Sequence, residues 1–270
     1  MPAFCELLLI SVPRSGTNFF CECVGALGGA VAYNELFNGR GAFGIKAGTA
    51  LDSLSEHLGT TVDSPRDPAL IRFFRSEPHA ALDLLAADAR AAGLGLMAYK
   101  VFPKQLPMPV LATLMQRPGT QVGFILRSRL DVYISYQKAQ QQERWKNADT
   151  TDFQPELDAA AFLDWAAGAD AWFDTTSRMA AACGARRHVW RYDSQIDVDK
   201  ADLVAALAAE LAAAGAGVTA PPAVGRTRHH RQDQARHPFR KVANGPALRE
   251  ALRAARRLRY ARAEPDLAGA

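Results

Sequence analysis

The sequence predicts an α/β fold, with a mainly parallel central sheet and helices on both of its faces. Short apolar runs without alternation, such as Leu7 to Val12 and Gln121 to Leu126, are typical of strands that are buried on both faces. Helix-like segments lie between these runs, and such alternation is typical of parallel sheets. The 270 residues suffice for one large domain of this kind or for two small ones.

The loop after the first strand has the composition of an anion site. Pro13 cannot donate a hydrogen bond to a sheet and ends the strand, and Gly16 allows a tight turn close to a ligand. Thr17 and Asn18 can cap a helix over Phe19 to Leu27. A strand, a loop and a helix N-terminus together direct backbone N–H groups and the positive helix end at one point, where phosphate is the usual occupant.

Arg14 adds a permanent, fork-shaped charge that suits phosphate or sulfate. The loop has one glycine and no lysine, so it lacks the Gly-x-x-x-x-Gly-Lys-Ser/Thr pattern of nucleotide triphosphatases. We expect residues 1–270 to form a single P-loop-like three-layer domain, in which the phosphate loop differs in sequence from that of the nucleotide triphosphatases.

The region after the first helix is less regular. Val31 begins a second short strand, and Asn34 and Glu35 lie near its end, where ligand sites of open α/β sheets form. Residues 38–80 are rich in Gly, Pro, Asp and Ser, which predicts irregular structure with one or two short helices. We expect residues 38–95 to be an insertion on the substrate side.

The third strand contains a lysine. Glu77 to Ala92 is predicted to be a helix ended by Gly93, and Leu96 to Phe102 a strand ended by Pro103. Lys100 costs free energy inside such a strand unless its ammonium group finds a partner. The alternative is that this group reaches the surface along its own stem.

The later elements follow from the same signals, namely apolar runs or helical spacing closed by Gly, Pro or polar clusters. They are a short helix over Leu111 to Gln116, the strand over Gln121 to Leu126, a helix from about Asp131 to Trp145, a polar loop over Asn147 to Pro155, a long helix over Leu157 to Ala182, a strand over His188 to Tyr192, a helix over Asp202 to Ala214 and a last helix over Pro246 to Ala263. Asp131 can be the N-cap of the helix that ends at Trp145, or this helix can already include Arg129 and Leu130.

A second phosphate-binding pattern follows the strand that ends at Leu126. Arg127 comes directly after this strand, and Ser135 lies eight residues further on in the next helix, with Asp131 between them. An arginine at a strand end and a serine in the first turns of a helix can converge on one phosphate, with a bidentate grip and a hydroxyl donor.

The two patterns together resemble the PAPS-dependent sulfotransferases, whose donor is 3′-phosphoadenosine 5′-phosphosulfate. Pro13-Arg14-Ser15-Gly16-Thr17 matches their 5′-phosphosulfate loop, and Phe124 to Ser135 fits their 3′-phosphate block, although Ser128-Arg129 replaces the usual Asn/Asp-Pro. The chain is most similar to bacterial carbohydrate sulfotransferases of the nodulation-factor and trehalose type. Further segments that resemble theirs are Asn34 to Asn38, Tyr99 to Phe102 with Gln105, and Arg231 through Arg240 to Pro246.

The resemblance implies transfer of a sulfuryl group from PAPS to an acceptor hydroxyl of a carbohydrate or a glycolipid, without a metal. Glu35 is then the general base, and Lys100 stabilises charge on the transferring group. Ser15, Gly16, Thr17 and Asn18 cradle the 5′-phosphate together with Arg14. On the 3′-phosphate side, the resemblance implies Arg127 and Ser135. In the basic segment that closes over the nucleotide, residues 226–262, it implies Arg231 and Arg240.

Charge and composition argue against two other classes of protein, those that bind nucleic acids and those that span a membrane. Residues 226–262 hold twelve Lys/Arg and two acidic residues, so a net charge of +10 lies at this end of a chain whose total is +4. A basic end favours an anionic partner, but few aromatic residues are interleaved there, so no nucleic acid is expected. No apolar run approaches the about 20 residues that cross a bilayer, so we expect a cytoplasmic protein without a transmembrane segment.

Two alternatives remain open. One is a nucleotide kinase or hydrolase with a degenerate phosphate loop, and the other is a non-catalytic module that binds a nucleotide or RNA. His57 and His79 are rivals of Glu35 as base but are expected to be solvated. The four cysteines are expected to be reduced core thiols, and the histidines at 229, 230 and 237 a solvated basic loop, because neither set has ligand spacing.

Overall fold

The computed structural model describes residues 4–46, 49–143, 149–229, 233, 235 and 237–267. Its centre is a five-stranded sheet in the order β2-β3-β1-β4-β5, in which every neighbouring pair is parallel. The predicted α/β fold is therefore confirmed. The strands are β1 (Cys5–Ile10), β2 (Ala30–Ala32), β3 (Leu96–Val101), β4 (Thr120–Leu126) and β5 (Arg186–Arg191).

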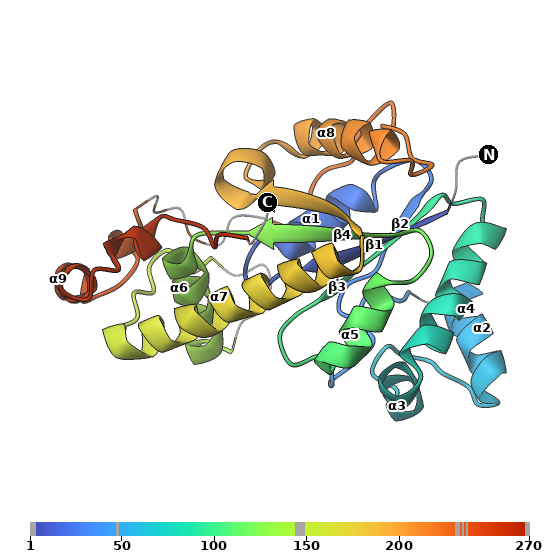
Figure 1. The fold of residues 1–270 in the computed structure, drawn as a ribbon, viewed down its shortest axis with the longest axis horizontal. Coiled ribbons are helices and arrows are strands. Elements are labelled where there is room, and N and C mark those ends of the chain that lie inside the picture. Colours follow the sequence, from blue (N-terminus) through green and yellow to red (C-terminus); the bar gives the residue numbers. More distant parts are fainter. Residues whose placement is uncertain are drawn as a thin grey trace.

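Helices connect the strands and cover both faces of the sheet (Figure 1). The described α-helices are α1 (Thr17–Val24), α2 (Thr49–Leu58), α3 (Pro68–Ser76), α4 (Pro78–Ala91), α5 (Met108–Met115), α6 (Arg129–Gln141), α7 (Ala159–Ala182), α8 (Lys200–Ala213) and α9 (Gly245–Ala254). Shorter turns are the π-helix η1 (Tyr192–Ile196) and the 3-10 helices η2 (Pro238–Arg240) and η3 (Leu258–Ala261). No helix in the described part of the chain is long and apolar enough to cross a membrane.

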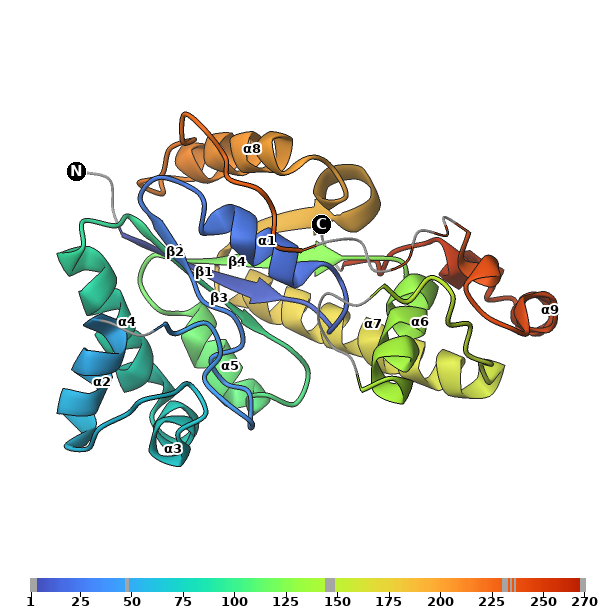
Figure 2. The ribbon, with the colours of Figure 1, turned by 180° about the vertical axis from the view of Figure 1, so that it is seen from behind.

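The sheet separates two hydrophobic layers because successive side chains of a strand point to opposite faces. Leu8 and Ile10 pack in the layer that contains α4, α5 and α7, whereas Leu7 and Leu9 pack in the layer that contains α1 and α8. Figure 2 shows the same division from behind. All four side chains are fully buried, and each contributes about 1.5–3 kcal/mol by leaving water. This explains the absence of polar alternation in the strand.

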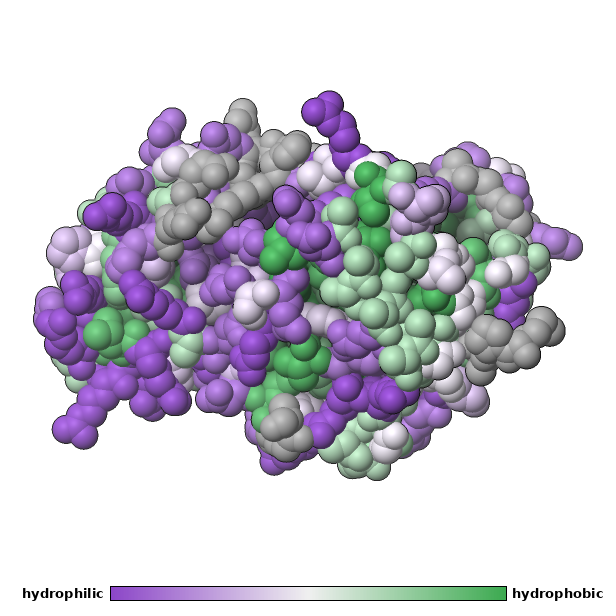
Figure 3. Space-filling model, turned by 90° about the horizontal axis from the view of Figure 1, so that it is seen from above, coloured by the Kyte–Doolittle hydropathy of each residue, from purple (hydrophilic) through white to green (hydrophobic). Residues whose placement is uncertain are grey.

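The region between β2 and β3 forms a helical layer beside the sheet. As predicted, residues 38–80 contain two short helices, α2 and α3. Both contact α4, and they place Leu54, Leu70 and Phe74 in the same core as the sheet. A third apolar cluster joins α6, α7 and α9 at the other end of the molecule. Figure 3 shows mostly hydrophilic side chains at this end.

Several predicted boundaries are wrong. Of the two predicted starts of α6, the one that includes Arg129 and Leu130 is confirmed and the one with Asp131 as N-cap is wrong. The N-cap is Ser128, and Asp131 lies in the first turn, where it accepts a hydrogen bond from the Ser128 hydroxyl at 2.8 Å. Trp145, the predicted end of that helix, lies outside the described residues. The first strand begins two residues earlier than predicted because Cys5 and Glu6 still pair with β3 and β4.

The predicted last helix over residues 246–263 is also wrong, because α9 ends at Ala254. Arg256 has φ +54°, in the left-handed region, and two backbone hydrogen bonds close the helix end. The Arg256 N–H donates to the carbonyl of Arg253 at 3.0 Å and the Arg257 N–H to that of Leu252 at 2.8 Å. This pattern ends helices whatever the helical propensity of the residues that follow.

The cysteines are free thiols, as predicted, and three of the four are buried. One buried titratable group lies in the sheet itself. His188 of β5 lies between Glu210 of α8, at 2.7 Å, and the side chain of Gln121 in β4, at 2.8 Å. The His188 hydrogen bond is the main reason that the pKa of Glu210 lies below its ordinary value.

Candidate functional site

The loop between β1 and α1 has the backbone of an anion site. Arg14 has φ +75° and Gly16 has φ +83°, so left-handed residues flank Ser15. Such alternation directs successive N–H groups to one side. Gly16 is the N-cap of α1, whereas Thr17 and Asn18 are already helical, so the prediction that these two side chains cap the helix is wrong.

Gly16 also cannot carry a side chain in this packing. A Cβ atom at this position would lie 2.5 Å from Cε2 of Tyr192, the first residue of η1. Because Gly16 has no side chain, Tyr192 at the end of β5 can pack directly against the loop that follows β1.

Two guanidinium groups meet at the carboxyl ends of β1 and β4. Arg127 donates from Nη1 to the carbonyl of Arg14 at 2.9 Å, and Arg14 donates from Nε to Oγ of Ser135 at 3.0 Å. Burial, and next the positive charge of Arg127, lower the pKa of Arg14 to about 10. Arg14 is thus still a cation at neutral pH, and the repulsion between the two guanidinium groups favours an anion between them.

Arg127 is held in place on several sides. Its guanidinium lies 4.1 Å from the ring centre of Tyr192, within the range of a cation–π contact. Its Nε is buried and has no hydrogen-bond partner among the described residues, and no ion pair to Arg127 occurs there either. The Arg127 side chain is half-buried and has no carboxylate within ion-pair distance among the described residues, which favours an anionic ligand as its partner.

Lys100 is buried at the end of β3 and does not reach the surface. It is 1% exposed, and its Nζ donates to Oγ1 of Thr17 at 3.2 Å and to Oδ1 of Asn18 at 2.5 Å. These contacts connect β3 to the first turn of α1. The expected cost of a lysine inside an apolar strand is therefore offset by partners from the phosphate loop.

Glu35 follows β2 and is oriented by two amide groups. Its Oε2 accepts hydrogen bonds from Nδ2 of Asn38 at 2.7 Å and from Nε2 of Gln105 at 2.9 Å. Its Oε1 lies 4.0 Å from Nζ of Lys100. The carboxylate is thus fixed beside the same lysine that contacts the loop, with one oxygen engaged by amides.

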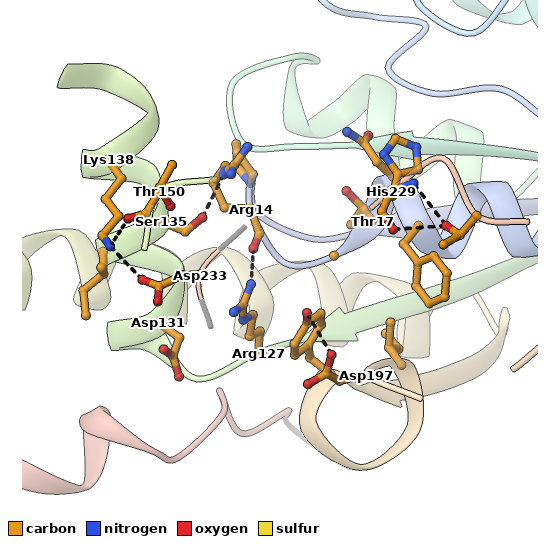
Figure 4. A pocket seen from close by; sticks show the side chains of 18 of the residues that line it. Arg14, Thr17, Arg127, Asp131, Ser135, Lys138, Thr150, Asp197, His229 and Asp233 are labelled. Atoms are coloured by element: carbon orange, nitrogen blue, oxygen red, sulfur yellow. Dashed lines mark hydrogen bonds and ion pairs between the residues drawn. The ribbon is translucent and has the colours of Figure 1, made fainter. Parts of the chain in front are cut away.

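These residues line one cavity of about 430 Å³. Of the sequence-predicted site residues, the structure brings to this cavity Arg14, Gly16, Thr17, Asn18, Glu35, Lys100, Arg127 and Ser135. In Figure 4, Ser135 and Lys138 lie on one side, Arg14 and Arg127 in the middle, and Thr17 and His229 on the other side. The volume lies in the range of ligand-binding cavities.

Two predicted residues, Ser15 and Arg240, do not line the cavity. Ser15 lies in the loop but is fully buried, and its Oγ has no partner among the described residues. Arg240 is exposed and its side chain does not line the cavity, while Arg231 lies outside the described residues. His57 packs against Phe73 with the two rings tilted, and His79 contacts Thr113, so neither of these rivals of Glu35 lies at the cavity.

Two buried lysines were missed by the sequence analysis. Lys138 donates to the carbonyl of Thr150 and to Oδ2 of Asp233, both at 2.7 Å, and Lys241 forms an ion pair with Asp131. Lys138 could have been found, because residues 131, 135 and 138 lie on one face of a helix. Lys241 carries no comparable local signal.

The basic C-terminal segment reaches the cavity through a cluster around Glu22 of α1. Glu22 accepts hydrogen bonds from Lys200 at 2.7 Å and from the Arg228 N–H at 3.1 Å, and His229 lies 3.7 Å from it. Burial alone would raise the pKa of Glu22, but these donors outweigh it and lower the pKa. His229 is therefore part of the cavity wall, which corrects the expectation of a solvated loop at this position.

Among the described residues, no group of three or more His, Cys, Asp or Glu is arranged to hold a metal ion. Comparison of the chain with protein-family models and with curated proteins found no match. What the chain does is therefore inferred from the cavity itself.

Proposed function

We propose that this protein transfers a sulfuryl group from PAPS to an acceptor hydroxyl. The observation that carries the proposal is the convergence of Arg14 and Arg127, which follow different strands, on one cavity with Ser135. The cavity lysines Lys100, Lys138, Lys200 and Lys241 each have a carboxylate within 4.0 Å, whereas Arg127 has none among the described residues. A dianionic phosphate would supply the missing counter-charge.

In this proposal the two phosphates of the donor occupy different parts of the cavity. The N-terminal turn of α1 and Arg14 bind the 5′-phosphate, which becomes the leaving group. Arg127 and Ser135 bind the 3′-phosphate, which distinguishes PAPS from ATP. Because Arg127 also holds the carbonyl of Arg14 at 2.9 Å, occupation of the 3′-phosphate position supports the loop that binds the 5′-phosphate.

The reaction is an in-line displacement at sulfur. Glu35 accepts the proton of the acceptor hydroxyl, whose oxygen forms the new S–O bond, while the S–O bond to the 5′-phosphate breaks and PAP (3′-phosphoadenosine 5′-phosphate) leaves. Lys100 lies between Glu35 and the loop, so its charge stabilises the sulfuryl oxygens as they pass from donor to acceptor. Positioning and charge therefore supply the catalysis.

Calorimetry of PAP, ADP and 5′-AMP without magnesium tests this proposal. PAP should bind much more tightly than ADP. The substitution Arg127→Ala should lower the affinity for PAP by about 30-fold to 150-fold, which is equivalent to the roughly 2–3 kcal/mol of a charge-assisted contact. The binding of 5′-AMP, which lacks the 3′-phosphate, should change little. Arg191→Ala is the matched control, because Arg191 ends the neighbouring strand β5 but is exposed and does not line the cavity.

Equal binding of PAP and ADP would refute the sulfotransferase proposal, as would a lack of PAP binding without magnesium. The first result favours a kinase or hydrolase, and the second a different class of ligand. If Arg127→Ala weakens PAP and 5′-AMP alike, Arg127 supports the loop and does not read the 3′-phosphate. Turnover is then followed as PAP released from PAPS in the presence of candidate acceptors.

A further inference from the structure

A second cavity of about 300 Å³ adjoins the first one. Pro13, Glu35 and Phe102 line both cavities, so they form the boundary between them. Glu35 is thus placed where a hydroxyl entering from the second cavity would meet a group held in the first. If the proposed function holds, the second cavity is the entry for the acceptor.

The inner wall of this second cavity is apolar and rigid. Phe37 is 1% exposed, and its ring packs edge-on against Phe74 and Tyr99, with ring centres 6.0 and 6.1 Å apart. Phe102 adds a second buried ring. Both side chains are almost fully buried, so they form the apolar floor of the cavity and fix its shape.

The outer rim of the second cavity is cationic. Arg75, in the last turn of α3, and Lys104, in the turn after β3, are both exposed and line it. A Cβ atom at Gly39 would lie 4.0 Å from Nη1 of Arg75, so this guanidinium reaches across to the loop that follows Glu35. Two positive charges from separate segments of the chain therefore lie at the opening of the second cavity.

These two cations have no ion-pair partner in the part of the chain that the structure describes. Neither Arg75 nor Lys104 forms an ion pair with a described residue, and Glu35, the carboxylate that lines this cavity, is already engaged by Asn38 and Gln105. Lys104 also has φ +69°, a backbone conformation that is strained for a residue with a side chain. Such strain is concentrated at functional sites, where the surrounding structure maintains it.

We propose that the acceptor is an anionic hydroxyl compound, whose carboxylate, phosphate or sulfate group pairs with Arg75 and Lys104. Its uncharged part lies over the apolar floor of the cavity, and its hydroxyl reaches Glu35. This inference rests on the proposed sulfuryl transfer and narrows its acceptor. The proton of that hydroxyl passes to Glu35, and this proton balances the one additional negative charge that the sulfated product carries. PAP leaves with the same charge as the PAPS that entered.

Phenyl β-D-glucuronide and phenyl β-D-glucoside provide a matched pair of probes, because they differ by a carboxylate in place of a hydroxymethyl group. Their binding to the PAP-saturated protein is measured by calorimetry, so the readout does not depend on turnover. The glucuronide should bind about tenfold more tightly, since two partly solvated charge-assisted contacts favour it. The preference should fall when salt is raised from low concentration to 0.5 M.

The variant Arg75→Ala/Lys104→Ala should bind both glycosides equally and keep its affinity for PAP. The control Arg66→Ala/Arg72→Ala removes the same charge from exposed residues before and within α3 that do not line the cavity, and should keep the preference. This control separates a local contact from a general effect of net charge.

The outcomes for the two proposals are distinct. If PAP binds but the glycosides bind equally, or neither of them binds, the anionic acceptor is refuted and the sulfotransferase proposal stands. If PAP itself does not bind, the proposed function fails, and the acceptor assignment that rests on it fails too. If the control variant loses the preference as fully as Arg75→Ala/Lys104→Ala does, the second cavity is not the source of the preference.

Discussion

Replacing Gly16 by alanine tests the close approach that shapes the phosphate loop. Two costs add at this position. A side chain at φ +83° is strained by about 1–2 kcal/mol. The new Cβ would also lie 2.5 Å from the ring of Tyr192, and overpacking of this kind costs about 1–3 kcal/mol. We therefore expect Gly16→Ala to lower the free energy of unfolding by about 2–5 kcal/mol.

Denaturant unfolding measures this change, and two further variants separate its parts. Gly93→Ala introduces the backbone strain without a steric clash, because φ is +73° at Gly93 and a Cβ there would meet nothing within 4 Å. Tyr192→Ala removes the clash, so in this background Gly16→Ala should cost only about 1–2 kcal/mol. The ring cannot simply swing away without cost, since it lies on Arg127 at 4.1 Å.

An equal cost of Gly16→Ala in the wild-type and Tyr192→Ala backgrounds would refute this reasoning. It would mean that the loop adapts to the new methyl group without touching Tyr192. Binding of PAP provides an independent check, because displacing Tyr192 disturbs Arg127, and Gly16→Ala should therefore weaken PAP more than Gly93→Ala does.

Three further predictions concern single groups. Lys100→Met should lower kcat for PAP release from PAPS by about 10²–10³, with a smaller effect on PAP affinity, because its charge is needed mainly in the transition state; equal losses in both would contradict this. Glu35→Gln keeps the hydrogen-bonding shape and should lower kcat by about 10²–10⁴ without changing PAP binding, whereas unchanged turnover would exclude Glu35 as the base. The lowered pKa of Glu210 contributes stability that is complete above its ordinary value of 4.5 and is lost as pH falls through the folded-state pKa. Unfolding of Glu210→Gln should therefore depend less on pH on the acid side, and an unaltered acid limb would contradict the role of His188.

The parts of the site that the sequence predicted are those with local signals. Arg14 and Arg127 directly follow apolar runs, and parallel strands bring their carboxyl ends to one edge, so their convergence could be expected. Ser135 follows from its helical spacing after Arg127. Lys100 was visible as a charge inside an apolar strand, and the structure supplies the partners that this anomaly required.

What could not be predicted depends on contacts between distant segments. Lys241 is buried because Asp131, 110 residues earlier in the chain, pairs with it, and no local pattern around Lys241 indicates this. Gly16 caps α1 because its left-handed backbone packs under Tyr192, so residue preference alone favoured Thr17. The end of α9 before the left-handed Arg256 could not be predicted, because the residues that follow it favour a helix.

The central position of β1 has a consequence for synthesis on the ribosome. Its neighbours are β3, paired from Leu96, and β4, paired from Thr120, so both edges of β1 stay unpaired until these strands have emerged. At about 5–20 residues per second, the intervening stretch takes roughly 6–24 s to translate. During this time the apolar segment Leu7 to Ile10 is an exposed edge that a chaperone or another nascent chain can bind. The strand that organises the finished protein is thus also its main aggregation risk while the protein is being made.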